Sequence, residues 1–160
     1  MKKVKVKIIF SQKGIIPEST IPKYATPGSS GCDIRSIEFL EIKPQEIKIV
    51  KTGIFLSIPE GYEIQVRSRS GLSSKGIIVL NSPGTIDSDY RGEIGVIIMN
   101  VSSEIFTINI GDRIAQMVCA EVIKIDFQSE DFQSKDFESY IDSKLGKTKR
   151  GRNGFGSTSI

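Results

Sequence analysis

Residues Asn81 to Val96 read NSPGTIDSDYRGEIGV, and this stretch is the clearest guide to the fold. The four residues at 81–84 are turn formers, and an apolar β-like run follows the polar centre of the stretch. We interpret it as a β-hairpin with carboxylates and an aromatic ring, Tyr90, at its mouth. Asp87 follows apolar Ile86 and precedes a polar turn, where a partly shielded carboxylate could act as a base. An acid that only satisfies turn amides is the alternative.

The same alternation of turns and strands extends in both directions along the chain. Short runs rich in Val, Ile and Phe are separated by Pro, Gly, Asn and Asp. Before residue 126 no segment has a helical period except one turn around residues 70–75. The pattern predicts an all-β sandwich or barrel of the jelly-roll kind. We expect strands near residues 4–9, 37–43, 46–51, 53–58, 62–68, 77–81, 94–100, 105–108 and 113–124.

The composition of the chain changes after residue 125. The next part is polar, with spaced aromatic residues, and Phe137, Tyr140 and Ile141 have the i, i+3, i+4 spacing of a short helix. Acidic residues come first and basic residues follow, which is usual for a solvated tail and also suits a polyanionic ligand. We therefore predict three parts: a β body at 1–125, a polar linker or insert at 126–149, and a Gly-rich terminal motif at 150–160.

The composition excludes several kinds of site. The 160 residues include no histidine, which excludes a His-based triad, a His general base and most zinc sites. No apolar run reaches the roughly 20 residues of a membrane span, and lysines interrupt the N-terminal apolar positions, so we expect a strand there rather than a signal peptide. Cys32 and Cys119 are far apart, as expected of reduced thiols in a cytoplasmic protein. The net charge of +3 is too small to indicate nucleic-acid binding by itself.

Two glycine-containing stretches with charged residues precede residues 81–96 in the sequence. PGSSGCDIRS, at 27–36, places Asp33 directly after a glycine turn, and an exposed turn aspartate is its simplest interpretation. RSRSGLSSKG, at 67–76, ends a strand with arginines on one face and continues into a helical turn. Backbone N–H groups at the start of such a turn suit an anion, and a guanidinium adds a planar set of donors. Two arginines on one strand face are nevertheless more often surface residues.

Two further stretches follow the central one. GDRIAQMV, at 111–118, reads as a strand whose alternation places Arg113 and Gln116 on opposite faces and Ile114 on the face of Gln116. Gln116 is then either a structural bridge or a ligand contact. The chain ends in KRGRNGFGSTSI, where glycines, hydroxyls and cations surround Phe155. This composition indicates a phosphate clamp with a ring that stacks on the ligand.

Taken in order, GCDIRS, RSGLSSKG, NSPGTIDSDYRGE, GDRIAQM and RGRNGFGST resemble the five motifs of the trimeric dUTPase family. The match covers roughly residues 15–125 and the last dozen residues. The resemblance implies a β-clip, distorted jelly-roll subunit with a flexible C-terminal arm. It implies a homotrimer with three active sites at subunit interfaces, each covered by a neighbour's arm. The implied reaction is hydrolysis of dUTP to dUMP and pyrophosphate with Mg²⁺, which keeps uracil out of DNA and supplies dUMP for thymidylate synthesis.

The resemblance also implies a role for each matching residue. Asp87 matches the base that activates water for attack on the α-phosphorus, Arg150 matches a catalytic arginine, and Asp33 matches an acid that holds Mg²⁺ through water. The residues that match contacts to uracil and deoxyribose are Asn81, Gly84, Tyr90, Gly95 and Phe155, the last by stacking. The residues that match contacts to the phosphates are Arg69, Ser70, Gly71, Gln116, Arg150, Gly156, Ser157 and Thr158.

The chain departs from the family pattern in two places. Asn153 stands where the arm usually has glycine, and the segment between Gln116 and Arg150 is longer than in compact members. Three other functions are alternatives. dCTP deaminase shares the fold, an inactive nucleotide-binding relative would have a broken motif, and DNA binding by the basic arm would be salt-sensitive. The intact run around Asp87 and the complete terminal motif favour a dUTPase, for which we expect neither membrane association nor stable nucleic-acid binding.

Overall fold

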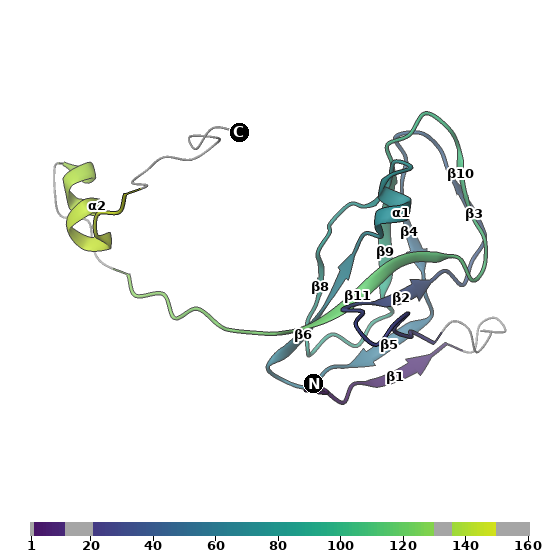
Figure 1. Ribbon diagram of the computed structural model, residues 1–160, viewed down its shortest axis with the longest axis horizontal. Coiled ribbons are helices and arrows are strands. Elements are labelled where there is room, and N and C mark those ends of the chain that lie inside the picture. The colour runs from purple at the N-terminus through teal and green to yellow at the C-terminus, as the bar shows by residue number, and fades with distance from the viewer. Residues whose placement is uncertain (1, 12–20, 130–135, 150–160) are drawn as a thin grey trace. The chain divides into compact units, whose positions relative to one another are not determined.

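The computed structural model describes residues 2–11, 21–129 and 136–149. These residues form mostly strands, with two short helices (Figure 1), so the predicted all-β class is confirmed. The helices are α1 (Ser70–Ser73) and α2 (Phe137–Leu145). The strands are β1 (Lys7–Phe10), β2 (Cys32–Arg35), β3 (Leu40–Ile42), β4 (Ile47–Lys51), β5 (Ile54–Ser57), β6 (Tyr62–Arg67), β7 (Ile77–Val79), β8 (Gly84–Ile86), β9 (Gly95–Asn100), β10 (Phe106–Ile108) and β11 (Arg113–Glu121).

The strands pair antiparallel in small sheets. The largest sheet within the described residues has the order β2–β11–β6–β8, and a three-stranded sheet has the order β4–β9–β7. Two further pairs are β1–β5 and β10–β3. In Figure 1, β11 is the long green strand beside β2 and β6. It therefore brings together segments that are far apart in the sequence.

The core is built from β-branched side chains that alternate along the strands. In β9, Val96 and Ile98 are buried while Ile97 between them is partly exposed. In the large sheet, Ile34 of β2 and Val66 of β6 point into the core. Because successive side chains of a strand point to opposite faces, the neighbours of these two residues point away from the core. The packed core thereby fixes the polar residues of β2 and β6 on the opposite face.

Most of the predicted strands are confirmed, with ends that shift by up to three residues. β2 was not predicted: Asp33 lies within a strand rather than in a turn, because Ile34 beside it is fully buried in the core. The helical turn around residues 70–75 and the helix at 137–141 are both present, as α1 and α2.

The predicted β-hairpin over residues 81–96 is wrong. Its first strand, β8, pairs with β6, whereas its second strand, β9, pairs with β4 and β7 in another sheet. Residues 81–95, which include β8 and lead into β9, therefore cross from one sheet to the other, and we call them the crossover segment. The reason is burial, since Ile86 packs against the core beside β6, which a hairpin projecting into solvent would not allow.

The chain divides into two compact units, residues 1–123 and 124–160. In the second unit, the Asp136 carboxylate accepts a hydrogen bond from the Ser139 backbone N–H (3.2 Å) and caps α2. No helix of the described residues is long and apolar enough to cross a membrane. The division into body, linker and terminal motif stays a prediction, because residues 150–160 lie outside the described part.

Candidate active site

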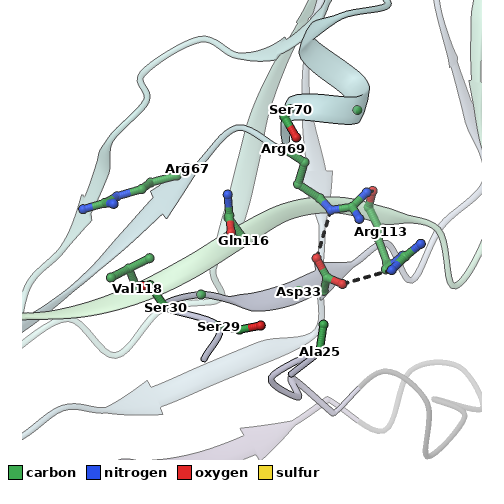
Figure 2. Close-up of a pocket in the computed structure, with 12 residues that line it drawn as sticks. Ala25, Ser29, Ser30, Asp33, Arg67, Arg69, Ser70, Arg113, Gln116 and Val118 are labelled. Carbon is green, nitrogen blue, oxygen red and sulfur yellow. Dashed lines mark hydrogen bonds and ion pairs between the residues drawn. The ribbon is translucent and has the colours of Figure 1, made fainter. Parts of the chain in front are cut away.

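A polar pocket of about 420 Å³ lies where β2, β6 and β11 meet the start of α1 (Figure 2). It brings together five residues that three separate motifs supply, which are Asp33, Arg69, Ser70, Gly71 and Gln116. The family resemblance implies a contact with the phosphates or with Mg²⁺ for all five. The described residues that line the pocket include three arginines and one acid, so its lining carries net positive charge.

Asp33 is the centre of the charged network. Its carboxylate accepts a hydrogen bond from Arg69 Nε at 2.9 Å and another from Arg113 Nη1 at 3.3 Å, as the dashed lines of Figure 2 show. Arg69 Nη1 also donates to the Arg113 carbonyl oxygen at 3.1 Å. A guanidinium has five N–H donors, so both arginines are held in place and keep donors for an anion in the pocket.

Arg113 is a pocket residue that simple alternation missed. Alternation placed it on the face opposite Gln116, yet both side chains line the pocket. The pairing of β11 with β2 shifts register between Arg113 and Ala115, which is a β-bulge or similar irregularity. The expected sharing of a face by Ile114 and Gln116 is wrong for the same reason, because Ile114 is buried in the core.

Gln116 is held on two sides. Its Nε2 donates to the Ser68 carbonyl oxygen at 3.1 Å. Its Oε1 lies so close to Gly31 that a Cβ atom there would approach it to 2.6 Å, so a side chain at position 31 would displace the amide. The second Nε2 hydrogen remains available to a ligand.

The first turn of α1 supplies backbone donors. The Leu72 N–H donates the first backbone hydrogen bond of this turn. Its acceptor is the carbonyl oxygen of Arg69, the residue before the helix, at 3.0 Å. The N–H groups of Ser70 and Gly71 precede it and, as at any helix start, have no carbonyl within the helix. Both residues line the pocket.

Arg67 lies on the far side of Gln116 from Asp33 (Figure 2). It is exposed, and its Nε and Nη2 both donate to Oε1 of Gln65, at 3.2 and 2.5 Å. A neutral amide does not cancel its charge, so Arg67 extends the positive lining. Alternation correctly placed Arg67 and Arg69 on one side.

Of the residues matched to uracil and deoxyribose, those in the described part of the chain do not line this pocket. Asn81, Gly84, Asp87, Tyr90 and Gly95 all lie in the crossover segment. The Asn81 amide covers Gly84, since a Cβ there would lie 2.8 Å from Nδ2. Asp87 is exposed in the single chain, so the partial shielding expected from its sequence neighbours is absent.

Tyr90 folds back on its own segment. Its hydroxyl donates to the Glu93 carbonyl oxygen at 3.0 Å, and a Cβ at Gly92 would collide with its ring. The ring thus depends on glycine at position 92. It remains 45% exposed, so it presents an aromatic surface to a ligand or a second subunit.

The residues matched in the terminal motif lie outside the described part of the chain. These are Arg150, Phe155, Gly156, Ser157 and Thr158, and the structure gives no account of them.

A metal held by protein side chains alone does not fit the site. Nowhere in the described part of the chain do three or more acidic or thiol side chains gather in a possible metal cluster. Asp33 is the one carboxylate among the described lining residues. Mg²⁺ commonly keeps several waters and binds through one or two carboxylates plus substrate phosphates. The donor set therefore fits an Mg²⁺ that arrives with a polyphosphate and contacts Asp33 through water.

The two cysteines lie outside the polar lining of the pocket. Both pack against the core. Burial raises the pKa of the Cys32 thiol, the hydrogen bond with Tyr24 opposes this, and the charge of Asp33 adds to it. Burial, followed by the charge of Glu121, raises the pKa of Cys119. Both thiols are therefore poor nucleophiles at neutral pH.

Comparison with known proteins identifies the family. The dUTPase family model matches residues 17–159. The deoxyuridine 5'-triphosphate nucleotidohydrolase of Helicobacter pylori (strain Shi470) is 48% identical over 147 residues, covering 91% of this chain and 93% of the relative. The enzyme of the same name from Fusobacterium nucleatum is 45% identical over 161 residues, covering 99% of each.

Solved structures agree with this. A variant of the Staphylococcus bacteriophage 80alpha dUTPase with dUpNHpp matches with a TM-score of 0.75 and 25% identity, covering 98% of this chain and 99% of that one. A dUTPase variant from phage phi11 of S. aureus, which coordinates a structural Mg(II) ion, matches with a TM-score of 0.68 and 28% identity, covering 81% and 99%. The β-clip, jelly-roll-like class is thereby confirmed, and the chain belongs to the dUTPase family of enzymes.

Proposed function

We propose that this chain hydrolyses dUTP to dUMP and pyrophosphate. The observation that carries the proposal is the pocket that joins Arg69, Ser70, Gly71 and Gln116 around Asp33. Guanidinium, hydroxyl, amide and backbone N–H donors are the groups that bind phosphate oxygens. The names of the H. pylori and F. nucleatum relatives supply the substrate.

The crossover segment is proposed to recognise the nucleoside. Backbone groups around Asn81, Gly84 and Gly95 would read the edge of uracil, and Tyr90 would lie against the deoxyribose and exclude a 2′-hydroxyl. The ring of Tyr90 is anchored through its hydroxyl to Glu93, which fixes the surface it presents. Phe155 of the terminal motif would stack on the base.

Asp87 is proposed as the general base. Its carboxylate takes a proton from water, the water oxygen forms a bond to the α-phosphorus, and the bond from that phosphorus to the bridging oxygen breaks. Pyrophosphate leaves with the electron pair. The donors of the pocket and Arg150 stabilise the charge that develops on the leaving group. Mg²⁺, held through water by Asp33, would supply further positive charge at the phosphates.

We also propose that the active sites are shared between subunits of a homotrimer. Asp87 is exposed in the single chain, and the crossover segment does not line the phosphate pocket of the same chain. A neighbouring subunit would shield the carboxylate and complete the site, with the arm at 150–160 closing over it. A cytoplasmic enzyme of this kind would keep uracil out of DNA and supply dUMP for thymidylate synthesis.

The test is product analysis with dUTP, dCTP, dTTP and UTP, each with Mg²⁺. We expect dUMP and pyrophosphate from dUTP alone. Asp87→Asn keeps the side-chain size and should lower kcat by about 10²–10⁴ with little change in KM, because a base acts in the transition state. Release of ammonia from dCTP would identify a deaminase instead, and an Asp87→Asn variant as fast as the parent would exclude this base.

A further inference from the structure

A serine between the phosphate pocket and the crossover segment contacts both. Ser68 follows the last residue of β6, the strand between β11, which carries Gln116, and β8, which begins at Gly84. Ser68 does not itself line the pocket. Its partners lie 11, 14 and 48 residues away in the sequence, so no local motif contains them.

Three different atoms of Ser68 make three hydrogen bonds. Its carbonyl oxygen accepts from Gln116 Nε2 at 3.1 Å. Its Oγ accepts from the Val79 backbone N–H at 2.8 Å. Its own backbone N–H donates to Ser82 Oγ at 3.1 Å. One residue thus connects the pocket amide, the end of β7 and the turn before β8.

Each partner bears on a site residue. Gln116 faces the pocket, and its amide orientation follows from the bond to Ser68. Ser82 lies beside Asn81, whose amide covers Gly84. A displacement of the 79–82 turn would therefore move the Ser68 backbone and with it the acceptor that orients Gln116.

We propose that Ser68 and Ser82 are positioning residues that couple the phosphate pocket to the nucleoside-binding segment of the same subunit. The inference rests on the proposed function for the identity of the ligand, and on the three bonds for the coupling. Anion binding that fixes Gln116 would order the turn before Gly84, and nucleoside binding at that turn would hold Gln116 in place. A shared hydrogen-bonded residue is the physical element that such coupling requires.

Ser82→Ala is the decisive variant, because Ser82 lies outside the pocket lining and only its hydroxyl is removed. We expect its dissociation constant for inorganic tripolyphosphate, measured by calorimetry on the full chain, to rise about threefold to tenfold, as loss of one hydrogen bond allows. Ser82→Thr retains a hydroxyl and should restore the parent affinity. Ser57→Ala, in β5 of another sheet, is the matched control and should bind as the parent does.

Coupling through Gln116 predicts a second result. In a Gln116→Ala background, Ser82→Ala should cause no further loss of tripolyphosphate affinity, because the orienting bond is already gone. Parent-like binding by Ser82→Ala, or losses that multiply independently in the double variant, would overturn the inference. Ser68→Ala, which removes only the acceptor for Val79, should raise the KM for dUTP more than it lowers kcat.

The same experiment separates the inference from the proposed function. A parent chain that binds tripolyphosphate but does not hydrolyse dUTP contradicts the function and leaves the coupling test intact. A parent chain that does not bind tripolyphosphate at millimolar concentrations overturns the anion pocket and the coupling together.

Discussion

Asp33 pairs with two arginines in a pocket that we assign to phosphates. Its negative charge therefore has two effects that can be measured separately: it neutralises the arginines and, in the proposed mechanism, it holds Mg²⁺ through water. Asp33→Asn keeps the shape and removes the charge that neutralises Arg69 and Arg113. Without Mg²⁺ we expect tripolyphosphate to bind at least as tightly as to the parent, because the guanidinium groups are no longer paired. With dUTP we expect half-maximal activity to need several times more Mg²⁺. Weaker binding without the metal would instead assign Asp33 to holding the arginines in position.

The two thiols give a second prediction at the residue scale. Because burial raises the pKa of Cys32 and Cys119, the reactive thiolate is scarce at pH 8. Iodoacetamide should therefore modify the native chain several times more slowly than the chain in guanidinium, and the native rate should still be rising above pH 9. Mass spectrometry of timed samples measures both rates. A native rate equal to the unfolded one would show that the thiols are open to solvent.

Some residues of the candidate site could be predicted from the sequence and others could not. The roles of Asp33, Arg69, Ser70, Gly71 and Gln116 follow from the resemblance of their motifs to a known family, and the structure brings these residues together. Arg113 was missed because strict alternation fails at the register shift in β11, and Ser68 was missed because its partners come from distant strands. A pattern confined to neighbouring residues carries neither kind of information.

At the scale of elements, Asn100 joins the end of β9 to the β3–β10 pair. It is fully buried, its Nδ2 donates to the carbonyl oxygens of Ile42 (2.8 Å) and Glu104 (2.7 Å), and its Oδ1 accepts from the Ser102 N–H (2.9 Å). Asn100→Ala leaves these backbone groups without the amide and should lower the free energy of unfolding by about 2–4 kcal/mol. Urea denaturation at fixed chain concentration measures this. A change below about 0.5 kcal/mol would mean that water replaces the amide.

Pairing between elements was the part of the fold that the sequence predicted least well. Strand positions follow from local β-propensity and turn residues, and they were largely correct. The departure of β8 from its expected partner follows from burial of Ile86 beside β6. Nothing near residue 86 in the sequence identifies β6 as that partner.

At the scale of the whole molecule, the proposed trimer and arm can be separated experimentally. A chain that stops at Thr148 lacks Arg150 and Phe155 but keeps every element described here. We expect it to sediment as a trimer, like the full chain, and to lose about 10³–10⁵ in kcat, the range seen when a catalytic arginine is removed from other phosphoryl-transfer enzymes. Full activity in the shortened chain would exclude a catalytic arm, and a monomeric full chain would exclude shared sites.

The register shift of β11 sets a limit on how this chain can change in length. Deleting one residue between Arg113 and Gln116 would restore simple alternation and turn Arg113 away from Asp33, or else reverse every later side chain of the strand relative to β6. Either outcome dismantles the pocket even though no lining residue is altered in kind. Insertions and deletions should therefore be tolerated in surface turns and excluded from these few positions, where the number of residues matters as much as their identity.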